Sequence, residues 1–318
     1  MSNGREKRPL GWPVNLLLFL ATLWTTLAAG AGHEGLAWAD FLTDPWRFLQ
    51  LGSPFAFSLI AILGAHEMGH YLVARRYKVD VSLPFFIPIP TEIGTFGAVI
   101  KMRSSIPSRQ ALLDIAVAGP LAGFLVALPV LCLGILLSKA IPLKDLQGLG
   151  GIYFGEPLIY KILVHLLRND PPDTTLFMNS FAFAGWIGLL VTFINLFPVG
   201  QLDGGHIEFA LVGSSGNKLS YWMTRLLLYW GLLGMANWIL WAGLGADGWL
   251  VKFLLSWCSP LYFGWGLILL ILTGMFGARH PSVEVWSPLT NGRKVLAVLG
   301  ILVFVLVLMP APISVEVF

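Results

Sequence analysis

Long apolar runs constrain the fold of this chain more than any other sequence feature. One of them extends from about residue 55 to 74 and contains His66, Glu67 and His70. A helix needs about 20 mainly apolar residues to cross the hydrocarbon core of a bilayer. The 318-residue chain is 56% hydrophobic and 12% charged, and soluble domains carry about twice that charged fraction. The sequence therefore predicts a polytopic membrane protein.

The apolar runs predict an all-α fold with about seven transmembrane helices. We expect one membrane-embedded domain over residues 1–318, with a core from about 55 to 206. Lys and Arg lie mostly in the segments on one side of this arrangement, which the positive-inside rule makes cytosolic. We therefore expect an integral membrane protein of a bacterial inner membrane, with its N-terminus on the cytosolic side. The expected spans are about 11–30, 55–74, 112–137 and 177–197, followed by 222–244, 249–276 and 295–310.

The first apolar run has two interpretations. Small residues at Ala28, Ala29 and Ala31 resemble a signal-peptide cleavage site. The run is longer than the usual apolar core of a signal peptide, which favours a retained span.

Composition narrows the chemistry of any functional site. The net charge is only +3, and the basic residues are scattered between the spans, so nothing indicates nucleic-acid binding. Cys132 and Cys258 both lie in apolar stretches, and the chain has no C-x-x-C pair. A metal site must therefore use histidine and carboxylate ligands.

The core contains a histidine pair with metal-ligand spacing. On a helix, His66 and His70 are four residues apart and share one face, so both imidazoles can hold one zinc ion. Glu67 lies beside them in the position of a general base. The five-residue pattern alone also arises by chance, so its interpretation depends on the rest of the chain.

A second polar cluster ends the fourth expected span. Pro198 and Gly200 break the helix there, which places Asn195 in its last turn and Asp203 on unwound backbone. A buried carboxylate at that depth needs a metal or a charged partner. Because the second and fourth spans run in the same direction, Asp203 can join His66 and His70 in the cytosolic half of the membrane. These three residues form the set that a catalytic zinc requires, with one Zn²⁺ per chain.

The expected core contains three further polar side chains. Asn195 either holds the substrate backbone and stabilises an oxyanion, or joins helices through hydrogen bonds. His206 follows Asp203 closely and reads as a boundary residue that completes the turn. Asp114 reads as an interfacial carboxylate beside the basic loop. Near it, Gly119 and Gly123 form a small-x-x-x-small face that lets another helix approach closely.

The segment between the second and third spans has no helical period. Prolines exclude a helix from residue 83 to 90, and residues 94–100 read as a strand or hairpin. The segment is too apolar for an ordinary solvated loop. We expect a short membrane-associated β-hairpin that dips into the bilayer or covers the site, with its backbone satisfied by protein or water.

The two motifs together, H-E-M-G-H and N-L-F-P-V-G-Q-L-D-G-G-H, resemble those of the site-2 protease family of intramembrane zinc metalloproteases. The proline-rich segment and G-T-F-G-A are similar to those of its bacterial and plastid EGY-like branch. The resemblance implies that His66, His70 and Asp203 bind zinc, that Glu67 is the base and that Asn195 positions the substrate. It also implies that a strand pairs with the unwound substrate, and this strand comprises Gly94, Thr95, Phe96, Gly97 and Ala98. From the sequence we expect neither the PDZ domain nor the paired CBS domains of some relatives.

These observations favour an intramembrane zinc endopeptidase. Its expected partners are the lipid bilayer and a single-span or multi-span membrane protein that it cleaves within or near a transmembrane helix. Two alternatives remain at this point: a transmembrane metal transporter, and a scaffold that binds helices without cutting them. The adjacency of Glu67 to a ligand histidine favours hydrolysis over transport, and keeping charged groups in a membrane without catalysis would be costly.

Overall fold

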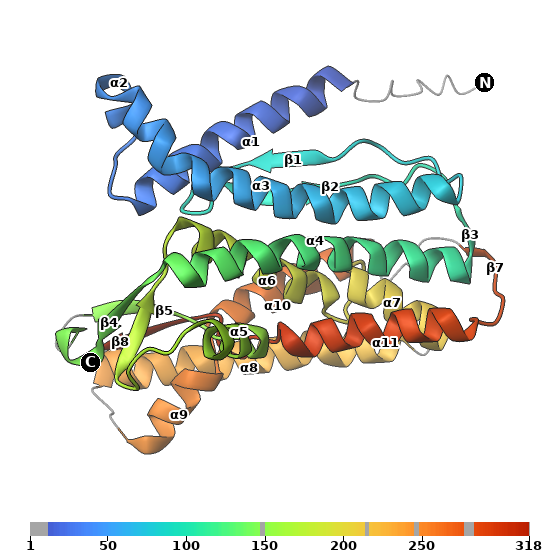
Figure 1. Cartoon of the computed structure of the whole chain (residues 1–318). Coiled ribbons are helices and arrows are strands. Elements are labelled where there is room, and N and C mark those ends of the chain that lie inside the picture. The colour runs from blue at the N-terminus through green and yellow to red at the C-terminus, as the bar shows by residue number, and fades with distance from the viewer. Residues whose placement is uncertain (1–11, 147–149, 214–215, 245–247, 277–282, 318) are drawn as a thin grey trace.

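The computed structural model describes residues 12–146, 150–213, 216–244, 248–276 and 283–317 (Figure 1). The described chain is mostly helical, as the sequence predicts, and it also contains short strands. The helices are α1 (Trp12–His33), α2 (Asp40–Thr43), α3 (Pro45–Arg76), α4 (Arg109–Leu137), α5 (Leu158–Leu167), α6 (Ser180–Leu196), α7 (Asp203–Val212), α8 (Gly216–Leu244), α9 (Trp249–Trp257), α10 (Leu261–Phe276) and α11 (Asn291–Leu306), with a 3-10 turn at Leu143–Leu146.

Among the described residues, three helices are long and apolar enough to cross a membrane. They are α1, α3 and α4, with 22, 32 and 29 residues respectively. These helices contain three of the predicted spans, although α3 starts at Pro45, about ten residues before the expected start of the second span. The apolar helix α6 has only 17 residues, which is at the short limit for a span.

Helices α3, α4 and α6 form the centre of the bundle, and small residues let them approach closely. A Cβ atom at Gly69 of α3 would lie 2.5 Å from the Ala118 carbonyl oxygen of α4. In the same way, a Cβ at Gly185 of α6 would lie 2.8 Å from the Leu131 Cβ of α4. Such contacts drive helix association where the surrounding lipid is as apolar as the side chains. The predicted small-residue face of the third span, Gly119 and Gly123, also contacts α3, because a Cβ at Gly123 would lie 3.1 Å from the His66 Cβ.

The predicted β-hairpin is confirmed. Strands β1 (Phe85–Pro88) and β2 (Thr95–Val99) pair antiparallel and lie against α1 and α3 (Figure 1). Their register shifts between Phe86 and Pro88, where Gly97 in the facing strand has a φ of 100°. This bulge gives the hairpin its twist.

Six other strands were not expected from the sequence. They form three two-stranded sheets, in which a parallel pair lies at one end of the bundle and two antiparallel pairs at the other. These are β3 (Ile106–Ser108) with β7 (Val283–Val285), β4 (Lys139–Pro142) with β6 (Thr174–Phe177), and β5 (Gly150–Phe154) with β8 (Ile313–Val317).

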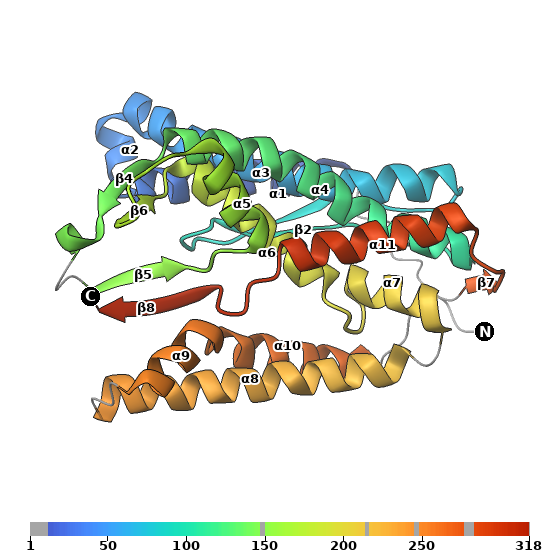
Figure 2. The same ribbon diagram turned by 60° about the horizontal axis from the view of Figure 1, so that its bottom comes forward.

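Helices α8, α9 and α10 lie together on one side of the bundle (Figure 2). The prediction of a single helical span at 249–276 is wrong, because the helix is interrupted between Trp257 and Leu261. Pro260 lies in this break, where proline cannot continue a helix. An apolar pocket separates α10 from α6 and is lined by Phe193, Phe197, Leu227, Tyr262, Trp265 and Leu269, among others.

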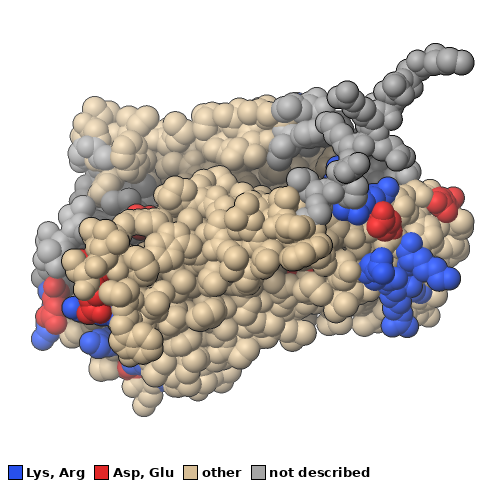
Figure 3. All heavy atoms as spheres, turned by 90° about the horizontal axis from the view of Figure 1, so that it is seen from above, with Lys and Arg blue, Asp and Glu red and all other residues tan. Residues whose placement is uncertain are grey.

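Charged side chains gather towards the two ends of the face shown in Figure 3. Lys and Arg are prominent at one end, where α3 terminates in Arg75 and Arg76 and is followed by Lys78. Acidic and basic groups are mixed at the opposite end, and the surface between the two ends carries almost none on this face. A surface without charged side chains is what the hydrocarbon core of a bilayer requires.

Candidate metal centre

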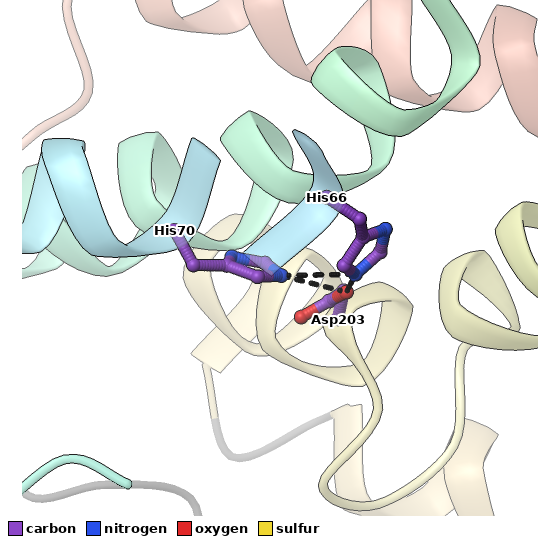
Figure 4. Close-up of side chains that lie close together, drawn as sticks. All are labelled: His66, His70 and Asp203. Carbon is purple, nitrogen blue, oxygen red and sulfur yellow. Dashed lines mark hydrogen bonds and ion pairs between the residues drawn. The ribbon is translucent and has the colours of Figure 1, made fainter. Parts of the chain in front are cut away.

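Three side chains from two helices converge on one point in the bundle (Figure 4). His66 and His70 lie one turn apart on α3, and their Nε2 atoms are 3.2 Å from each other. The Oδ2 atom of Asp203 lies 3.3 Å from the Nε2 of His66 and 3.2 Å from the Nε2 of His70. The structure thus brings together the three residues predicted as metal ligands, although Asp203 is 133 residues from His70 in the chain.

Asp203 is held in place by a tight turn between α6 and α7. The break is shorter than the sequence indicated, because α6 ends at Leu196 and Asp203 is already the first residue of α7. The prediction that Asp203 lies on unwound backbone is therefore wrong, and only residues 197–202 are unwound. A Cβ at Gly204 would overlap the Leu196 carbonyl, so this approach of α7 to the end of α6 requires glycine after Asp203.

Arg109 fixes the other end of α7. Its guanidinium donates to the carbonyls of Ala210 and Leu211 at 2.6 and 2.9 Å. Helix C-termini leave such carbonyls without intrahelical partners. The guanidinium also lies over the ring of Trp286, 4.9 Å from its centroid. Helix α7, and with it Asp203, is thereby tied to the first turn of α4.

The hydrogen bonds of His70 indicate what the site holds. Its Nδ1 lies 2.7 Å from the Ile115 carbonyl oxygen, which can only accept, so Nδ1 carries a proton. In the neutral imidazole, Nε2 then presents a lone pair towards the Asp203 carboxylate. Two groups with facing lone pairs repel each other unless a cation or a proton lies between them. A carbonyl partner on the far nitrogen is also the usual arrangement for a metal-binding histidine.

The spacing of the three atoms fits zinc. Tetrahedral zinc with Zn–N and Zn–O distances of 2.0–2.1 Å sets its ligand atoms about 3.3 Å apart. The observed separations are 3.2, 3.2 and 3.3 Å. His66 and His70 are buried and Asp203 is half-buried. Among the described residues, this is the one group of His, Cys, Asp and Glu side chains that could hold a metal ion.

Two glycines of α4 make room for the histidines. A Cβ at Gly119 would overlap the His70 imidazole at Nε2, the metal-facing atom. A Cβ at Gly123 would lie 3.1 Å from the His66 Cβ. The sequence predicted that this glycine pair lets a helix approach, but it did not reveal that the approaching side chains are the two histidines.

The predicted base and the predicted asparagine both lie beside the metal ligands. Glu67 is buried, and its carboxylate lies near the backbone of Ile100, the residue just after β2. The Asn195 Nδ2 lies in the last turn of α6, 3.4 Å from the His66 Nε2. Strand β2, which holds Thr95 to Ala98, therefore ends next to Glu67. No assay tests the roles of these residues, so they stay predictions.

Asp114 does not join the metal centre but contacts two other residues near it. The Arg293 Nη2 lies 3.0 Å from its Oδ2, and Arg293 also donates to the Tyr77 hydroxyl at 2.8 Å. Burial and the hydrogen bond to Asp114 raise the pKa of Tyr77. Since Ile115 follows Asp114, this cluster anchors the segment of α4 whose carbonyl holds His70. Sequence reasoning missed Tyr77 and Arg293, because nothing in the sequence indicates that residues 77 and 293 meet.

Four histidines lie outside the centre; His33 contacts the Glu92 carbonyl in the hairpin turn, and the other three have different surroundings. His206 is half-buried in α7, and His165 lines a pocket between α5 and β6. His280, expected in a polar loop, lies outside the described residues. Neither His206 nor His165 belongs to the metal-ligand group.

Together, the apolar helices, the converging His-His-Asp set and the adjacent Glu67 define a membrane protein with a metallopeptidase-type centre. Residues 54–236 match the sequence profile of Peptidase family M50, and the chain belongs to this family. The match confirms the resemblance to the site-2 protease family, and it covers both predicted motifs.

Individual relatives agree with the family assignment. The "Probable zinc metalloprotease EGY1, chloroplastic" of Oryza sativa subsp. japonica is 30% identical over 93% of this chain and 50% of its own length. The protein of the same name from Arabidopsis thaliana is 28% identical over 93% of this chain and 53% of its own length. The Arabidopsis "Probable zinc metalloprotease EGY2, chloroplastic" is 35% identical over 54% of this chain and 30% of its length. The chain thus spans about half the length of the first two relatives.

These relatives confirm the similarity to the EGY-like branch. Their names describe zinc metalloproteases, which agrees with a His66, His70 and Asp203 centre whose spacing fits zinc. The prediction of a metallopeptidase-type chain is therefore confirmed at the level of the family.

Proposed function

We propose that this chain is an intramembrane zinc endopeptidase that hydrolyses a peptide bond within or near a transmembrane helix of another membrane protein. The observation that carries the proposal is the convergence of His66, His70 and Asp203 at 3.2–3.3 Å beside the buried Glu67. Membership in a peptidase family supports hydrolysis over other uses of such a centre.

The residues divide the chemistry between them. His66, His70 and Asp203 hold one zinc ion, which when bound polarises the scissile carbonyl and acidifies water. Glu67 takes the proton of the attacking water and passes it to the leaving amine nitrogen. Asn195 can donate its amide to the substrate carbonyl, because it needs no change of charge to do so.

The hairpin supplies a place for an extended substrate. Peptide bonds inside a helix are shielded, so a substrate helix must unwind before water can attack it. The outer edge of β2 has no strand partner among the described residues, and Phe96 on it is 76% exposed. We propose that the substrate adds to this edge as a strand, which satisfies the backbone groups freed by unwinding. The substrate-binding residues would be Gly94, Thr95, Phe96, Gly97 and Ala98.

The finer topology is also part of the proposal. We propose seven crossings, with α6, the α8 to α10 region and α11 completing the bundle around α1, α3 and α4. The cluster of basic residues at one end of Figure 3 supports a cytosolic position for the N-terminus and for the end of the bundle nearer the metal centre. A bacterial inner membrane stays the predicted location, and the lipid bilayer and a membrane-protein substrate the predicted partners.

The decisive test compares the native chain with Glu67→Gln during co-expression with candidate single-span membrane proteins. We expect the native chain to produce fragments whose ends map to a transmembrane helix by mass spectrometry. Glu67→Gln should retain zinc and cut at least about 100-fold more slowly, since general-base catalysis contributes roughly that much. Glu156→Gln, an exposed glutamate of an ion pair with Lys161, is the matched control. Undiminished cleavage by Glu67→Gln would refute the proposed mechanism.

The purified native chain and the co-expressed candidate proteins also test the two alternatives, a metal transporter and a helix-binding scaffold. A metal transporter would move zinc into liposomes, and a helix-binding scaffold would retain candidate proteins without producing fragments. Transport through a membrane uses successive sites, and the described residues contain a single group able to hold a metal ion. This observation favours hydrolysis.

A further inference from the structure

The β1–β2 hairpin needs external support to hold a fixed position. Each of its strands pairs only with the other in the described structure, and an isolated two-stranded hairpin is at best marginally stable. The end of β2 at Val99 lies beside the metal centre, because the next residue, Ile100, lies near the Glu67 carboxylate and β2 contacts α3. The position of β2 relative to Glu67 therefore depends on what holds the rest of the hairpin.

Helix α1 provides that support through three polar side chains along its length. The Asn15 Nδ2 donates to the carbonyls of Leu83 and Pro84, just before β1, at 3.2 and 2.9 Å. At the other end of α1, the His33 Nε2 lies 2.9 Å from the Glu92 carbonyl oxygen in the hairpin turn. Asn15 and His33 are about 27 Å apart along the helix axis. Helix α1 thus contacts both ends of the hairpin.

Thr25 makes the contact closest to β2. Its Oγ1 lies 2.6 Å from the carbonyl oxygen of Gly94, the residue before Thr95. Two carbonyls of α1 itself lie farther from the same hydroxyl, at 3.1 Å each. A hydroxyl has one proton to donate, and the shortest contact directs it to Gly94.

The backbones of α1 and the hairpin also meet at this point. Gly94 has a φ of 78°, and a Cβ there would lie 2.6 Å from the Thr25 carbonyl oxygen and from the Thr26 Cα. A side chain at position 94 would push the turn away from α1. Phe19 and Phe86 add an edge-to-face ring contact, with centroids 5.3 Å apart, on the β1 side.

We propose that α1 sets the register of substrate cleavage, and that Thr25 is the positioning residue. The inference rests on the proposed function, because it concerns the strand to which the substrate would add. A bound strand aligns its hydrogen bonds with those of β2, so the position of β2 beside Glu67 decides which peptide bond reaches the metal. Moving β2 along its axis by about 3.4 Å presents the neighbouring peptide bond instead.

The chain offers a matched control one turn earlier in α1. Thr22 is fully buried, and its Oγ1 has no hydrogen-bond partner among the described residues. Thr22→Val and Thr25→Val remove the same hydroxyl and keep nearly the same volume in the same helix. Thr25→Ser keeps the hydroxyl and serves as the rescue variant.

The experiment identifies fragments of one cleaved membrane-protein substrate by mass spectrometry, with kcat and KM measured for each variant. Thr25→Val should lower kcat/KM about threefold to tenfold and add products cut one or two residues from the main site. Hydrogen exchange should become faster in the peptide containing Thr95 to Val99. Thr22→Val and Thr25→Ser should match the native chain in cleavage site and rate, and all three variants should retain zinc and melting temperature.

The outcomes separate this inference from the proposed function. If the native chain cuts and Thr25→Val cuts the same bond at the same rate, α1 does not set the register and only this inference is overturned. A slower Thr25→Val with unchanged products, unchanged hairpin exchange and a lower melting temperature would also overturn it, because the effect would then be on folding. If neither the native chain nor Thr22→Val cuts, the proposed function fails and the inference fails with it.

Discussion

Two polar clusters lie beside α4, and they differ in how their donors and acceptors are matched. Beside the first half of α4, the metal centre (His66, His70 and Asp203) sets lone-pair atoms 3.2–3.3 Å apart. At the end of α4, Arg168 donates to the carbonyls of Ile135 and Ser138 at 3.0 and 2.8 Å, and makes two bonds to the Asp170 carboxylate. We refer to Arg168, Asp170 and these carbonyls as the capping cluster.

In the capping cluster, every donor of the Arg168 contacts named above faces an acceptor, so the cluster needs no bound ligand. The metal centre lacks such matching. The Nε, Nη1 and Nη2 atoms of Arg168 all donate to acceptors, at the end of a helix whose carbonyls need donors. At the metal centre, acceptors face acceptors, and a buried arrangement of that kind is stable only with a cation or a proton between them. Matching donors to acceptors therefore distinguishes a polar cluster that holds the fold from one that binds a ligand.

Asp203→Asn should give the largest effect and distinguish the clusters directly. The amide is nearly isosteric but a poor zinc ligand, so zinc affinity should fall by more than the roughly 10–100-fold that loss of an outer partner costs. Asp170→Asn, the same change in the capping cluster, should leave zinc content unchanged. Metal analysis of the purified proteins by mass spectrometry measures both. Equal zinc content in the two variants would contradict the claim that the metal centre binds zinc and the capping cluster does not.

Gly119→Ala should be nearly as damaging without touching a ligand. The added methyl group would overlap the His70 imidazole and displace Nε2 from the metal position. We expect zinc affinity to fall at least about tenfold. Gly64→Ala in α3 is the control, because its Cβ would come no closer than 3.9 Å to Phe86. Normal zinc content and cleavage in Gly119→Ala would show that α4 yields there, and that the glycine is not required by the site.

Arg168→Met should lower stability and leave the metal centre intact. The carbonyls of Ile135 and Ser138 lose their donor, so the melting temperature in detergent should fall by about 2–4 °C. Lys161→Met, which removes an exposed partner of Glu156, should change it much less. Loss of zinc from Arg168→Met would mean that the capping cluster and the metal centre are coupled through α4.

The smallest expected effect is a pH dependence of the capping cluster. The Arg168 guanidinium lowers the pKa of Asp170. A carboxylate with a lowered pKa contributes stability above its ordinary pKa, and that contribution is lost as the pH falls through the folded-state pKa. The melting temperature of the native chain should therefore exceed that of Asp170→Asn from pH 7 to 5. The difference should shrink below about pH 4. A difference that persists undiminished into stronger acid would argue against the ion pair.

Sequence reasoning identified the chemistry because each half of the centre has a local pattern. Helical spacing places His66 and His70 on one face, and Pro198 with Gly200 ends a helix just before Asp203. The hairpin was also readable, since prolines exclude a helix and the following residues have strand character. These signals depend on neighbours in the chain and need no knowledge of the fold.

Features that depend on distant pairs could not be read. Gly119 faces the His70 ring only because of how α3 crosses α4, and Thr25 meets Gly94 only because α1 lies along the hairpin. The strands β3 to β8 form by pairing between segments far apart in sequence. The interruption between α9 and α10 had a local signal in Pro260, but the continuous apolar run around it predicted one span.

X-ray absorption at the zinc edge of the purified native chain tests the central claim most directly. We predict one zinc per chain, bound by nitrogen and oxygen atoms at about 2.0–2.1 Å and showing the outer-shell scattering of two imidazole rings. The Asp203→Asn protein should lose this signal, and Asp170→Asn should keep it. A chain without zinc, or zinc bound by sulfur at about 2.3 Å, would contradict the assignment of His66, His70 and Asp203 as its ligands.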